Sequence, residues 1–378
     1  MKHASAFSQL GHEVEVLSVE RLYEHKLGKK IPDIFAWYGI DRIPVKLFRD
    51  RSMRFYLDTY LGARLFHVLR TMKLDKVFPA NDPERAISEY CSEQNFDICY
   101  CRAFSCAYYN LQREVPTIVE THGAHPELNR VIPYLARYFE QEHFLKLVTI
   151  HQAIADKYIE MGLPESKVLV AEDAVDIERF DAIEEPKDEL RSTLGLPRGG
   201  RIVTYAGSLK PGKGIRTILR TARQLRQYSN VQFLIVGGEN SEVARWQREA
   251  ERCGVENVIW AGFVANEMIP QYLKSSDALF MPYDLRERKA VMDINTTSPI
   301  KLFEYMAARR PIVTAEIATI SKILRHESEA ILVPPGDDYA PAIMTVLGNP
   351  DLAKRLVEGA YSTVQRYTYK KRGRAILS

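Results

Sequence analysis

A helix-forming segment near residue 300 carries side chains that could bind a nucleotide. Thr297–Val313 reads TSPIKLFEYMAARRPIV, which predicts a turn, a helix and then a buried strand. Ser298 can cap the helix, and Pro299 suits its first position, where a missing N–H costs nothing. The free N–H groups of such a helix start suit a phosphate or a sugar hydroxyl, and Glu304, one turn in, suits a ribose diol. An ordinary capped helix with a solvated glutamate is the alternative interpretation.

A second candidate is a glycine-rich loop that follows a strand. Ile202–Ile215 reads IVTYAGSLKPGKGI, which predicts a strand, a turn with two lysines and a helix. Glycines let backbone N–H groups approach an anion, and Lys210 or Lys213 can add positive charge for a diphosphate. The pattern is neither a P-loop nor the dinucleotide-binding fingerprint. We expect Lys213 to matter more, because it lies between Gly212 and Gly214, where the backbone can approach the anion most closely.

Together the two segments resemble the retaining glycosyltransferases of the GT-B fold, in the large family-4 group. The resemblance runs through the C-terminal half, in the family's order, in AGSLKPGKG, FLIVGG (Phe233–Gly238), WAGFV (Trp260–Val264), SSDALFMPY (Ser275–Tyr283), SPIKLFEYMAARRPIV and VPPGD (Val333–Asp337). It implies a nucleotide-sugar-dependent glycosyltransferase of the hexosyltransferase type that retains the anomeric configuration. It requires no metal and no other cofactor, and the sequence contains no D-x-D motif.

The resemblance also assigns residues to the donor site. The implied diphosphate- and sugar-binding residues are Gly207, Ser208, Lys213, Ser298, Pro299 and Ile300. The implied nucleoside-binding residues are Gly237, Phe263, Val264 and Glu304. In this assignment Lys213 holds the diphosphate and Glu304 the ribose, while the backbone of Phe263 and Val264 meets the base.

Two positions depart from the family's pattern. Ser208 stands where many relatives carry an Arg, and Thr296 stands where many carry a Glu that grips the donor sugar. The SPIKLFEYMA wording indicates a branch of the family, but the donor sugar and the base stay open. A non-catalytic partner subunit that binds an active transferase is one alternative. A sugar-nucleotide epimerase on the same fold is another, and the SPIKLFEYMA wording speaks against it.

A histidine in the first half is the candidate catalytic residue. Thr117–Glu120 is a predicted strand that ends at Thr121, His122 and Gly123. The carboxyl ends of parallel strands face the ligand-binding cleft in such domains. In the resembled family, a histidine at this position touches the donor sugar and helps the transfer. A structural histidine on a loop is the alternative, and His125 is a weaker candidate.

Strands and helices alternate through both halves of the chain, which predicts two Rossmann-like, doubly wound α/β domains that face each other across a cleft. We place an acceptor-side domain at residues 1–182 and a donor-binding domain at residues 183–378. The last helix, about residues 362–378, is expected to pack back on the first domain. His3–Leu10 already looks like the later part of a first helix. We therefore expect that the first strand of the N-terminal domain and its loop are missing and that this domain is truncated.

Composition limits the class of protein. The chain has 378 residues, enough for two domains with cores of their own. The net charge of +3 does not suggest a nucleic-acid binder. No apolar run approaches the roughly 18 residues of a transmembrane helix, and no signal peptide is evident. Five cysteines, an odd number, are more typical of reduced thiols than of a disulfide framework. We expect a cytoplasmic protein.

Residues 42–76 form a basic segment with nine Lys or Arg and three Asp. Aromatic residues and leucines are interleaved at helical spacing, which predicts two amphipathic helices. Basic amphipathic helices bind anionic membrane surfaces. We expect peripheral attachment to the inner face of the membrane, where a glycan or lipid-linked acceptor of polysaccharide biosynthesis would be met. Helices packed on the sheet with a solvated basic face are the alternative.

Overall fold

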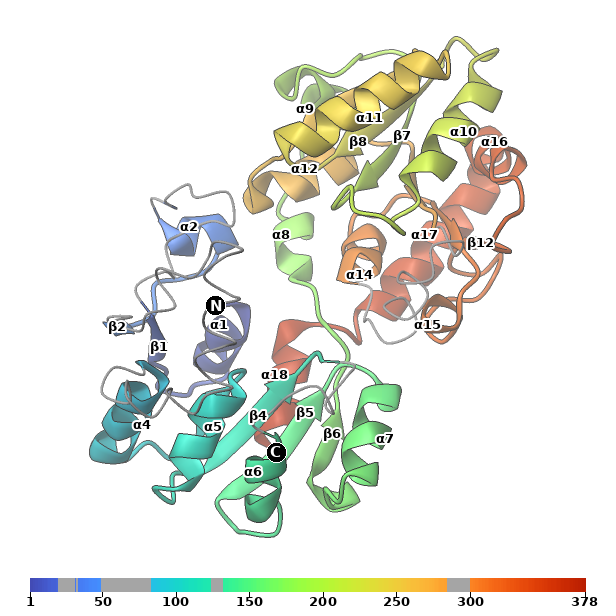
Figure 1. The fold of residues 1–378 in the computed structure, drawn as a ribbon. Coiled ribbons are helices and arrows are strands. Elements are labelled where there is room, and N and C mark those ends of the chain that lie inside the picture. The colour runs from blue at the N-terminus through green and yellow to red at the C-terminus, as the bar shows by residue number, and fades with distance from the viewer. Residues whose placement is uncertain (20–30, 32, 49–82, 124–131, 284–299) are drawn as a thin grey trace. The chain divides into compact units, whose positions relative to one another are not determined.

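The structure of the protein is a computed structural model that describes residues 1–19, 31, 33–48, 83–123, 132–283 and 300–378 (Figure 1). The chain divides into two compact units. The first unit consists of Met1–Ala36, Ile40–Ala171 and Ile376–Ser378, and the second of Trp37–Gly39 and Glu172–Ala375. Each unit is built on parallel strands with helices packed against them, as the alternation in the sequence predicts.

In its described residues, the second unit contains one six-stranded parallel sheet with the order β12-β11-β10-β7-β8-β9. The strands are β7 (Arg201–Ala206), β8 (Val231–Val236), β9 (Val258–Gly262), β10 (Ala278–Met281), β11 (Ile312–Ala315) and β12 (Ile331–Val333). The chain runs from β7 through β8 to β9 on one side and then returns to β10 on the other side of β7. The strand order therefore reverses between β7 and β10, at the switch point where doubly wound sheets bind ligands.

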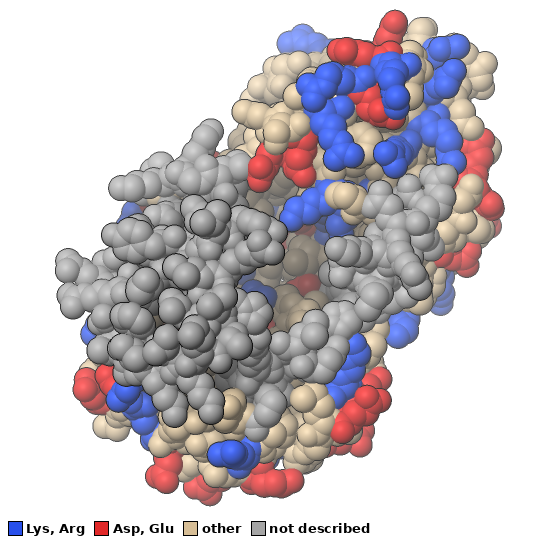
Figure 2. Space-filling model, viewed as in Figure 1, with Lys and Arg blue, Asp and Glu red and all other residues tan. Residues whose placement is uncertain are grey.

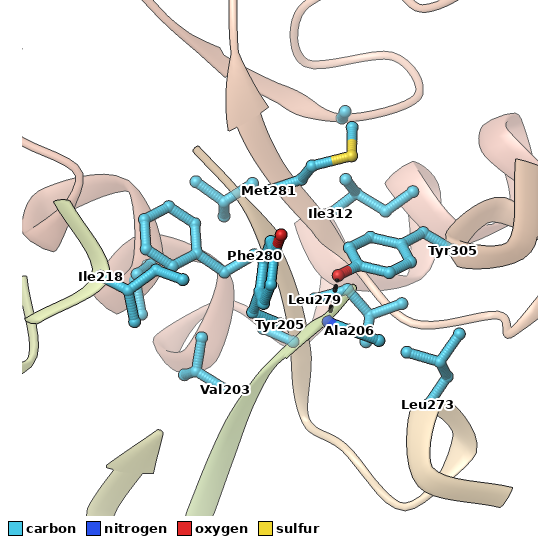
Figure 3. Close-up of a cluster of buried hydrophobic side chains, with 14 of the residues drawn as sticks. Val203, Tyr205, Ala206, Ile218, Leu273, Leu279, Phe280, Met281, Tyr305 and Ile312 are labelled. Carbon is cyan, nitrogen blue, oxygen red and sulfur yellow. Dashed lines mark hydrogen bonds between the residues drawn. The ribbon is translucent and has the colours of Figure 1, made fainter. Parts of the chain in front are cut away.

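The helices of the second unit pack on this sheet and on one another, as Figure 1 shows for α14 and α17 and for α10 and α16. They are α8 (Ile177–Asp181), α9 (Lys187–Thr193), α10 (Ile215–Leu225), α11 (Asn240–Arg252), α12 (Ile269–Lys274), α14 (Ile300–Ala307), α15 (Ala318–Ser321), α16 (Ala340–Gly348), α17 (Pro350–Val364) and α18 (Tyr369–Leu377), with the short 3-10 helix η8 (Asn266–Met268). Apolar side chains of β7, β10 and β11 fill the core (Figure 3). Tyr305 of α14 enters it, and its hydroxyl accepts a hydrogen bond of 2.7 Å from the Ala206 amide.

The first unit contains two separate parallel sheets in the part that the structure describes. One has the order β3-β4-β5-β6, with β3 (Cys99–Cys101), β4 (Thr117–Thr121), β5 (Phe144–Thr149) and β6 (Val168–Val170). The other pairs β1 (Val16–Val19) with β2 (Val45–Phe48). Among the described residues no strand joins β1 to β3, so each of the two has one strand neighbour.

The first unit has its own helices, several of which complete two apolar clusters with the larger sheet. They are α1 (Lys2–Gln9), α2 (Ile34–Tyr38), α4 (Pro83–Gln94), α5 (Phe104–Leu111), α6 (Ile132–Leu135) and α7 (Gln152–Glu160), with the 3-10 helices η6 (Ala136–Tyr138) and η7 (Glu165–Lys167). Phe7 of α1 packs with Ile118 of β4 and with Ile376, at the end of α18. Ile376 is therefore part of the first unit's core, and Ile376–Ser378 belong to that unit.

The basic segment at residues 42–76 begins differently from the prediction. Its first part, Val45–Phe48, is strand β2 and not helix, because its backbone pairs in parallel register with Val16–Val19. Lys46 in this strand lies over the Tyr90 ring, with Nζ 3.4 Å from the ring centroid. Tertiary pairing therefore overrides the helical spacing of the apolar residues here. Residues 49–76 lie outside the described residues.

Positive charge is spread unevenly over the visible surface. Figure 2 shows Lys and Arg gathered over α10 and α11 of the second unit. The exposed arginines of α10 are Arg216, Arg220 and Arg223, and this helix has no acidic residue. In the described parts of the chain, no helix is both long enough and apolar enough to cross a membrane.

Candidate functional site

The carboxyl end of β7 passes into a backbone turn that only glycine can make. Gly207 has φ +154°, and its amide donates a hydrogen bond of 2.8 Å to the Val236 carbonyl at the end of β8. Gly237 has φ +120°, and a Cβ on it would lie 2.2 Å from the Gly207 carbonyl oxygen. The two predicted site glycines therefore sit against each other, where neighbouring strands end.

The loop that follows is fixed by two side chains and by one close approach of the backbone. The Tyr205 hydroxyl donates a hydrogen bond of 2.8 Å to the Ser208 carbonyl. The indole N–H of Trp246, on α11, donates one of 3.1 Å to the Leu209 carbonyl. A Cβ on Gly214, the residue before α10, would lie 2.5 Å from the Pro282 carbonyl oxygen after β10. The loop between β7 and α10 is thus held against the end of β10, at the switch point of the sheet.

Lys213 lies where the two loops meet. Its Nζ is 5.9 Å from the centroid of the Tyr283 ring, just beyond β10. The flanking Gly212 and Gly214 have φ near +80°. Lys213 is half-buried, whereas Lys210 points into solvent as an exposed side chain. This geometry fits an ammonium group that is held ready for an anion at the switch point.

Helix α14 forms as predicted at Ile300–Ala307. Most of its side chains are buried, and Glu304 is half-buried while Ile300 is 43% exposed. Glu304 acts on Tyr305, whose pKa is raised first by burial and also by this carboxylate. Ser298, Pro299 and Thr296 lie outside the described residues, so the predicted cap and the departure at position 296 stay predictions.

One site residue was missed by the sequence analysis. Lys301, on the first turn of α14, places its Nζ 3.0 Å from the Tyr205 hydroxyl and 4.8 Å from the centroid of that ring. The same nitrogen would lie 1.7 Å from a Cβ on Gly207. Burial lowers the pKa of Lys301 to about 8, against the opposing effect of Glu304. The available signal was a lysine three residues before Glu304 in an otherwise apolar helix face.

The predicted nucleoside-binding residues follow β8 and β9. The Gly237 amide donates a hydrogen bond of 2.7 Å to the Gly262 carbonyl, so the ends of these two strands meet as well. Phe263 directly follows β9 and is 43% exposed, and Val264 is half-buried. The second unit thus brings Gly207 and Gly237 together, while Phe263 and Val264 stand at the end of the outer strand.

His122 lies in the first unit, at the carboxyl end of β4. Its Nε2 is 2.5 Å from Oε1 of Glu120, a carboxylate with no exposed side-chain surface. Nε of Arg102, which follows β3, is 3.9 Å from the same oxygen. A buried carboxylate on one ring nitrogen fixes the orientation of an imidazole. His122 is therefore a positioned histidine. His125 lies outside the described residues.

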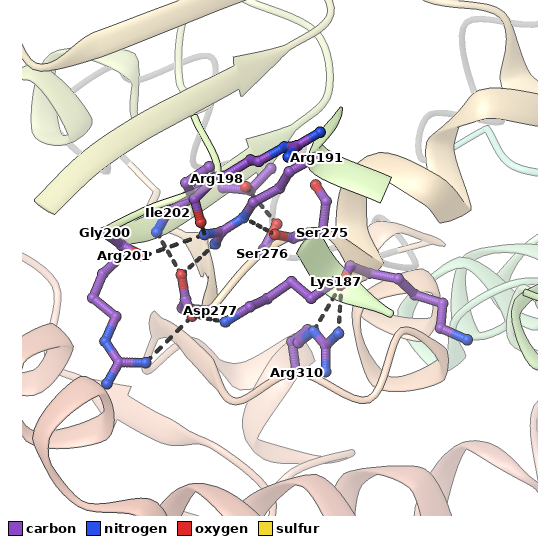
Figure 4. A network of polar contacts seen from close by, with 12 residues as sticks. Lys187, Arg191, Arg198, Gly200, Arg201, Ile202, Ser275, Ser276, Asp277 and Arg310 are labelled. Carbon is purple, nitrogen blue, oxygen red and sulfur yellow. Dashed lines mark hydrogen bonds and ion pairs between the residues drawn. The ribbon is translucent and has the colours of Figure 1, made fainter. Parts of the chain in front are cut away.

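A polar cluster at the opposite ends of β7 and β10 holds the sheet together (Figure 4). Asp277, just before β10, accepts hydrogen bonds from the Ile202 amide at 2.7 Å and from Arg191 and Lys187 at 2.5 Å each. Arg191 is 1% exposed. Burial disfavours the charge on Asp277, but these donors hold its pKa below the usual value. This cluster lies at the amino ends of the strands, away from the loops, and is structural.

Metal binding has no support in the described ranges. No group of three or more His, Cys, Asp and Glu that could hold a metal ion occurs among these residues.

Comparison with known proteins identifies a matching family. Residues 186–363 match the model of the family described as glycosyl transferases group 1. The match covers most of the second unit, including the loop after β7 and helix α14.

Two curated proteins are similar in sequence. The chain is 26% identical over 261 residues to alpha-D-kanosaminyltransferase from Streptomyces kanamyceticus, which is 65% of each chain. It is 29% identical over 200 residues to phosphatidyl-myo-inositol mannosyltransferase from Mycobacterium leprae (strain TN), which is 50% of each chain. The chain thus spans 50% to 65% of the length of these relatives.

Solved structures share the fold over nearly the whole chain. Anabaena Alr3699/HepE in complex with UDP-glucose has a TM-score of 0.68 and 17% identity, over 96% of this chain and 98% of its own. WaaG, a glycosyltransferase involved in lipopolysaccharide biosynthesis, has a TM-score of 0.63 and 14% identity, over 100% and 93%. The predicted α/β architecture with parallel sheets is confirmed.

Proposed function

We propose that this chain is a group 1 glycosyltransferase that transfers a hexose from a nucleotide-sugar donor to an acceptor, because residues 186–363 match that family and the chain shares the fold of solved glycosyltransferases. The observation that carries this proposal is the loop between Gly207 and Gly214, pinned at the switch point with lysine ammonium groups beside it. A departing nucleoside diphosphate gains negative charge as its bond to the sugar breaks. Preorganised N–H groups and ammonium groups stabilise such charge without reorganisation.

The donor is a sugar carried on a nucleoside diphosphate, and uridine diphosphate sugars are the first to test. Anabaena Alr3699/HepE, which shares the fold, is in complex with UDP-glucose. In this chain Glu304 would accept hydrogen bonds from the ribose hydroxyls, since a carboxylate can accept from both. Gly237 and the backbone of Phe263 and Val264 would meet the base. No metal or other cofactor is needed, because Lys213 supplies the positive charge for the diphosphate.

His122 is the proposed catalytic residue. Held by Glu120, its imidazole would touch the donor sugar and orient it for transfer. The reaction would retain the anomeric configuration of the donor, as the family resemblance implies. The configuration of the product, read by proton NMR, tests this directly, and an inverted product would contradict it.

The acceptor is proposed to be a glycan or a lipid-linked glycan of polysaccharide biosynthesis. The names of two similar proteins support this class, since one is a phosphatidyl-myo-inositol mannosyltransferase and the other takes part in lipopolysaccharide biosynthesis. A lipid-linked acceptor fits a cytoplasmic enzyme attached to the inner face of the membrane through the basic segment at residues 42–76.

The decisive experiment measures binding and turnover separately. Calorimetry with UDP, GDP and ADP identifies the base, and release of the diphosphate from the matching nucleotide sugars measures turnover. Lys322→Met, at an exposed position after α15, serves as the control variant. Binding together with sugar transfer supports the enzyme. Tight binding with no turnover on any acceptor would favour a non-catalytic partner subunit, and no binding of any diphosphate would overturn the donor site.

A further inference from the structure

Lys301 of helix α14 lies against the loop that follows β7. Its side chain leaves the first turn of α14 and ends over Gly207, where a single added carbon would lie 1.7 Å from Nζ. A side chain at position 207 would therefore have to displace the ammonium group. Lys301 of helix α14 and the turn after β7 are therefore in direct contact.

The contacts of this ammonium group extend into the loop. Nζ donates to the Tyr205 hydroxyl at 3.0 Å, and that hydroxyl donates to the Ser208 carbonyl at 2.8 Å. The Tyr205 hydroxyl therefore accepts a hydrogen bond from Lys301 and donates one to the Ser208 carbonyl. An ammonium group has three N–H donors, and one of them is used on Tyr205. The position of Ser208 is thereby coupled to Lys301.

The charge of Lys301 is poorly neutralised by its surroundings. Within the described ranges Lys301 forms no ion pair with a carboxylate. The Tyr205 phenol lies beside it, and Glu304 on the same helix acts on its charge. The phenols of Tyr283 and Tyr305 interact in turn with Tyr205. Burial raises the pKa of Tyr205, so this phenol stays neutral at physiological pH. Burial lowers the pKa of Lys301 to about 8, so the site holds its ammonium at a cost that an anion would relieve.

The loop itself lacks a charge at the corresponding place. Position 208 carries a serine, and the next lysine of the loop, Lys210, is exposed. Resting on the proposed function, we propose that the Lys301 ammonium is a second positive charge of the donor site and binds an oxygen of the nucleoside diphosphate beside Gly207. Lys213 and Lys301 then approach the diphosphate from the loop and from helix α14, respectively.

This arrangement links donor binding to the uptake of a proton by Lys301. An anion beside Nζ raises the pKa of Lys301, so binding above pH 8 takes up a proton. The affinity for diphosphate then falls as the pH rises through the pKa of the free protein. Between pH 6.5 and pH 9 the protonated fraction of a group with a pKa of about 8 falls about tenfold, and the affinity for UDP should fall by up to that factor. Uridine lacks the diphosphate and should bind equally at both pH values.

The test compares UDP and uridine by calorimetry at pH 6.5 and pH 9, in wild type, Lys301→Met, Lys301→Arg and the control Lys322→Met. We expect Lys301→Met to bind UDP at least tenfold more weakly at pH 6.5, with uridine affinity changed less than twofold and the pH dependence lost. Lys301→Arg, charged at both pH values, should bind UDP independently of pH. Lys322→Met should resemble wild type.

A readout on the unaltered protein guards against a misfolded variant. At pH 8.5 the binding enthalpy of UDP to wild type should depend on the ionisation enthalpy of the buffer, which reports proton uptake. Absence of proton uptake, or wild-type affinity for UDP in folded Lys301→Met, would overturn the role of Lys301. Failure of wild type to bind any nucleoside diphosphate would instead overturn the donor site as a whole.

Discussion

Glu304 is the residue on which the ribose contact depends in the proposed site. We expect Glu304→Ala to weaken binding of UDP and of uridine alike by roughly 1–3 kcal/mol, because ribose hydroxyls would lose a charged acceptor. Calorimetry with both ligands measures this, and the exposed Glu358→Ala on α17 is the control. Unchanged affinity for uridine in the Glu304 variant would remove this carboxylate from the nucleoside site.

The prediction for His122 concerns the rate of sugar transfer. We expect His122→Ala to lower kcat by roughly a hundredfold or more, with a small change in the KM for the donor, as is typical when a positioned catalytic imidazole is lost. Steady-state kinetics with the identified donor measures the effect, and His143→Ala provides a control on a partly exposed histidine elsewhere in the first unit. Turnover equal to wild type would leave His122 with a structural role.

Site residues were predicted where a local sequence pattern identifies them. They were missed where only their packing in the folded structure identifies them. His122 could be predicted, because it follows a recognisable strand. Its partner Glu120 stood two residues earlier on the same face of that strand, but neither its burial nor its contact could be read from the spacing. Lys301 could not be recognised, because its role depends on Gly207, which lies 94 residues away in the sequence.

At the scale of elements, the amino ends of β7 and β10 are joined by Asp277. We expect Asp277→Asn to lower the free energy of unfolding by about 3–5 kcal/mol, because Arg191 would keep a buried charge without its partner. Urea unfolding at neutral pH measures this. Glu249→Gln, which breaks the exposed contact with Arg252, should change stability by less than about 1 kcal/mol. Equal effects of the two substitutions would contradict the stabilising role of Asp277.

The same carboxylate predicts a dependence on pH. The folded state holds the pKa of Asp277 below its ordinary value of 3.8. Stabilisation is therefore complete above that value and is lost as the pH falls through the lower, folded-state pKa. The stability difference between wild type and Asp277→Asn should accordingly be constant near neutral pH and shrink below about pH 4.

The contact between Gly207 and Gly237, at the carboxyl ends of β7 and β8, gives a further prediction at this scale. Gly237→Ala would place a carbon 2.2 Å from the Gly207 carbonyl, at a φ of +120° that alanine rarely adopts. We expect the loop to shift, with binding of UDP weakened more than tenfold and stability lowered by about 1–3 kcal/mol. Gly348→Ala, where nothing lies within 4 Å, is the matched control. A Gly237 variant that binds UDP like wild type would show that the turn does not set the site.

Strands of the second unit were predicted closely because their sequences are short apolar runs between turn residues. The strand predicted at the start of Ile202–Ile215 is β7, and the helix predicted within Thr297–Val313 is α14. The polar cluster around Asp277 was not predicted, because an aspartate before a strand is indistinguishable in sequence from an ordinary turn residue. Only the structure shows that Arg191 lies against it. The strand at Val45–Phe48 was assigned to a helix, because its partner Val16–Val19 is remote in sequence and the local spacing is ambiguous.

At the scale of the whole molecule, the proposed attachment to a membrane through residues 42–76 can be tested by reversing charges. We expect reversal of Arg49, Arg51 and Arg54 to Glu to reduce binding to anionic liposomes in a salt-dependent way. Co-sedimentation at low and high salt measures this. Reversal of Arg216, Arg220 and Arg223 on α10 changes the charge equally on another basic surface and is the control. If the α10 variant loses binding instead, the second unit carries the membrane surface.

The polar cluster around Asp277 and the hydrogen bonds at Ser208 and Leu209 also bear on the entropy of binding. The strands that carry the loops are fastened at their amino ends, and the loop after β7 is already fastened at its carbonyl groups. A diphosphate that settles on this backbone would find it ordered, so little conformational freedom is left to lose. The free energy of the contacts with the anion should then contribute almost fully to the affinity. The loop should also have the same backbone conformation with and without the bound diphosphate.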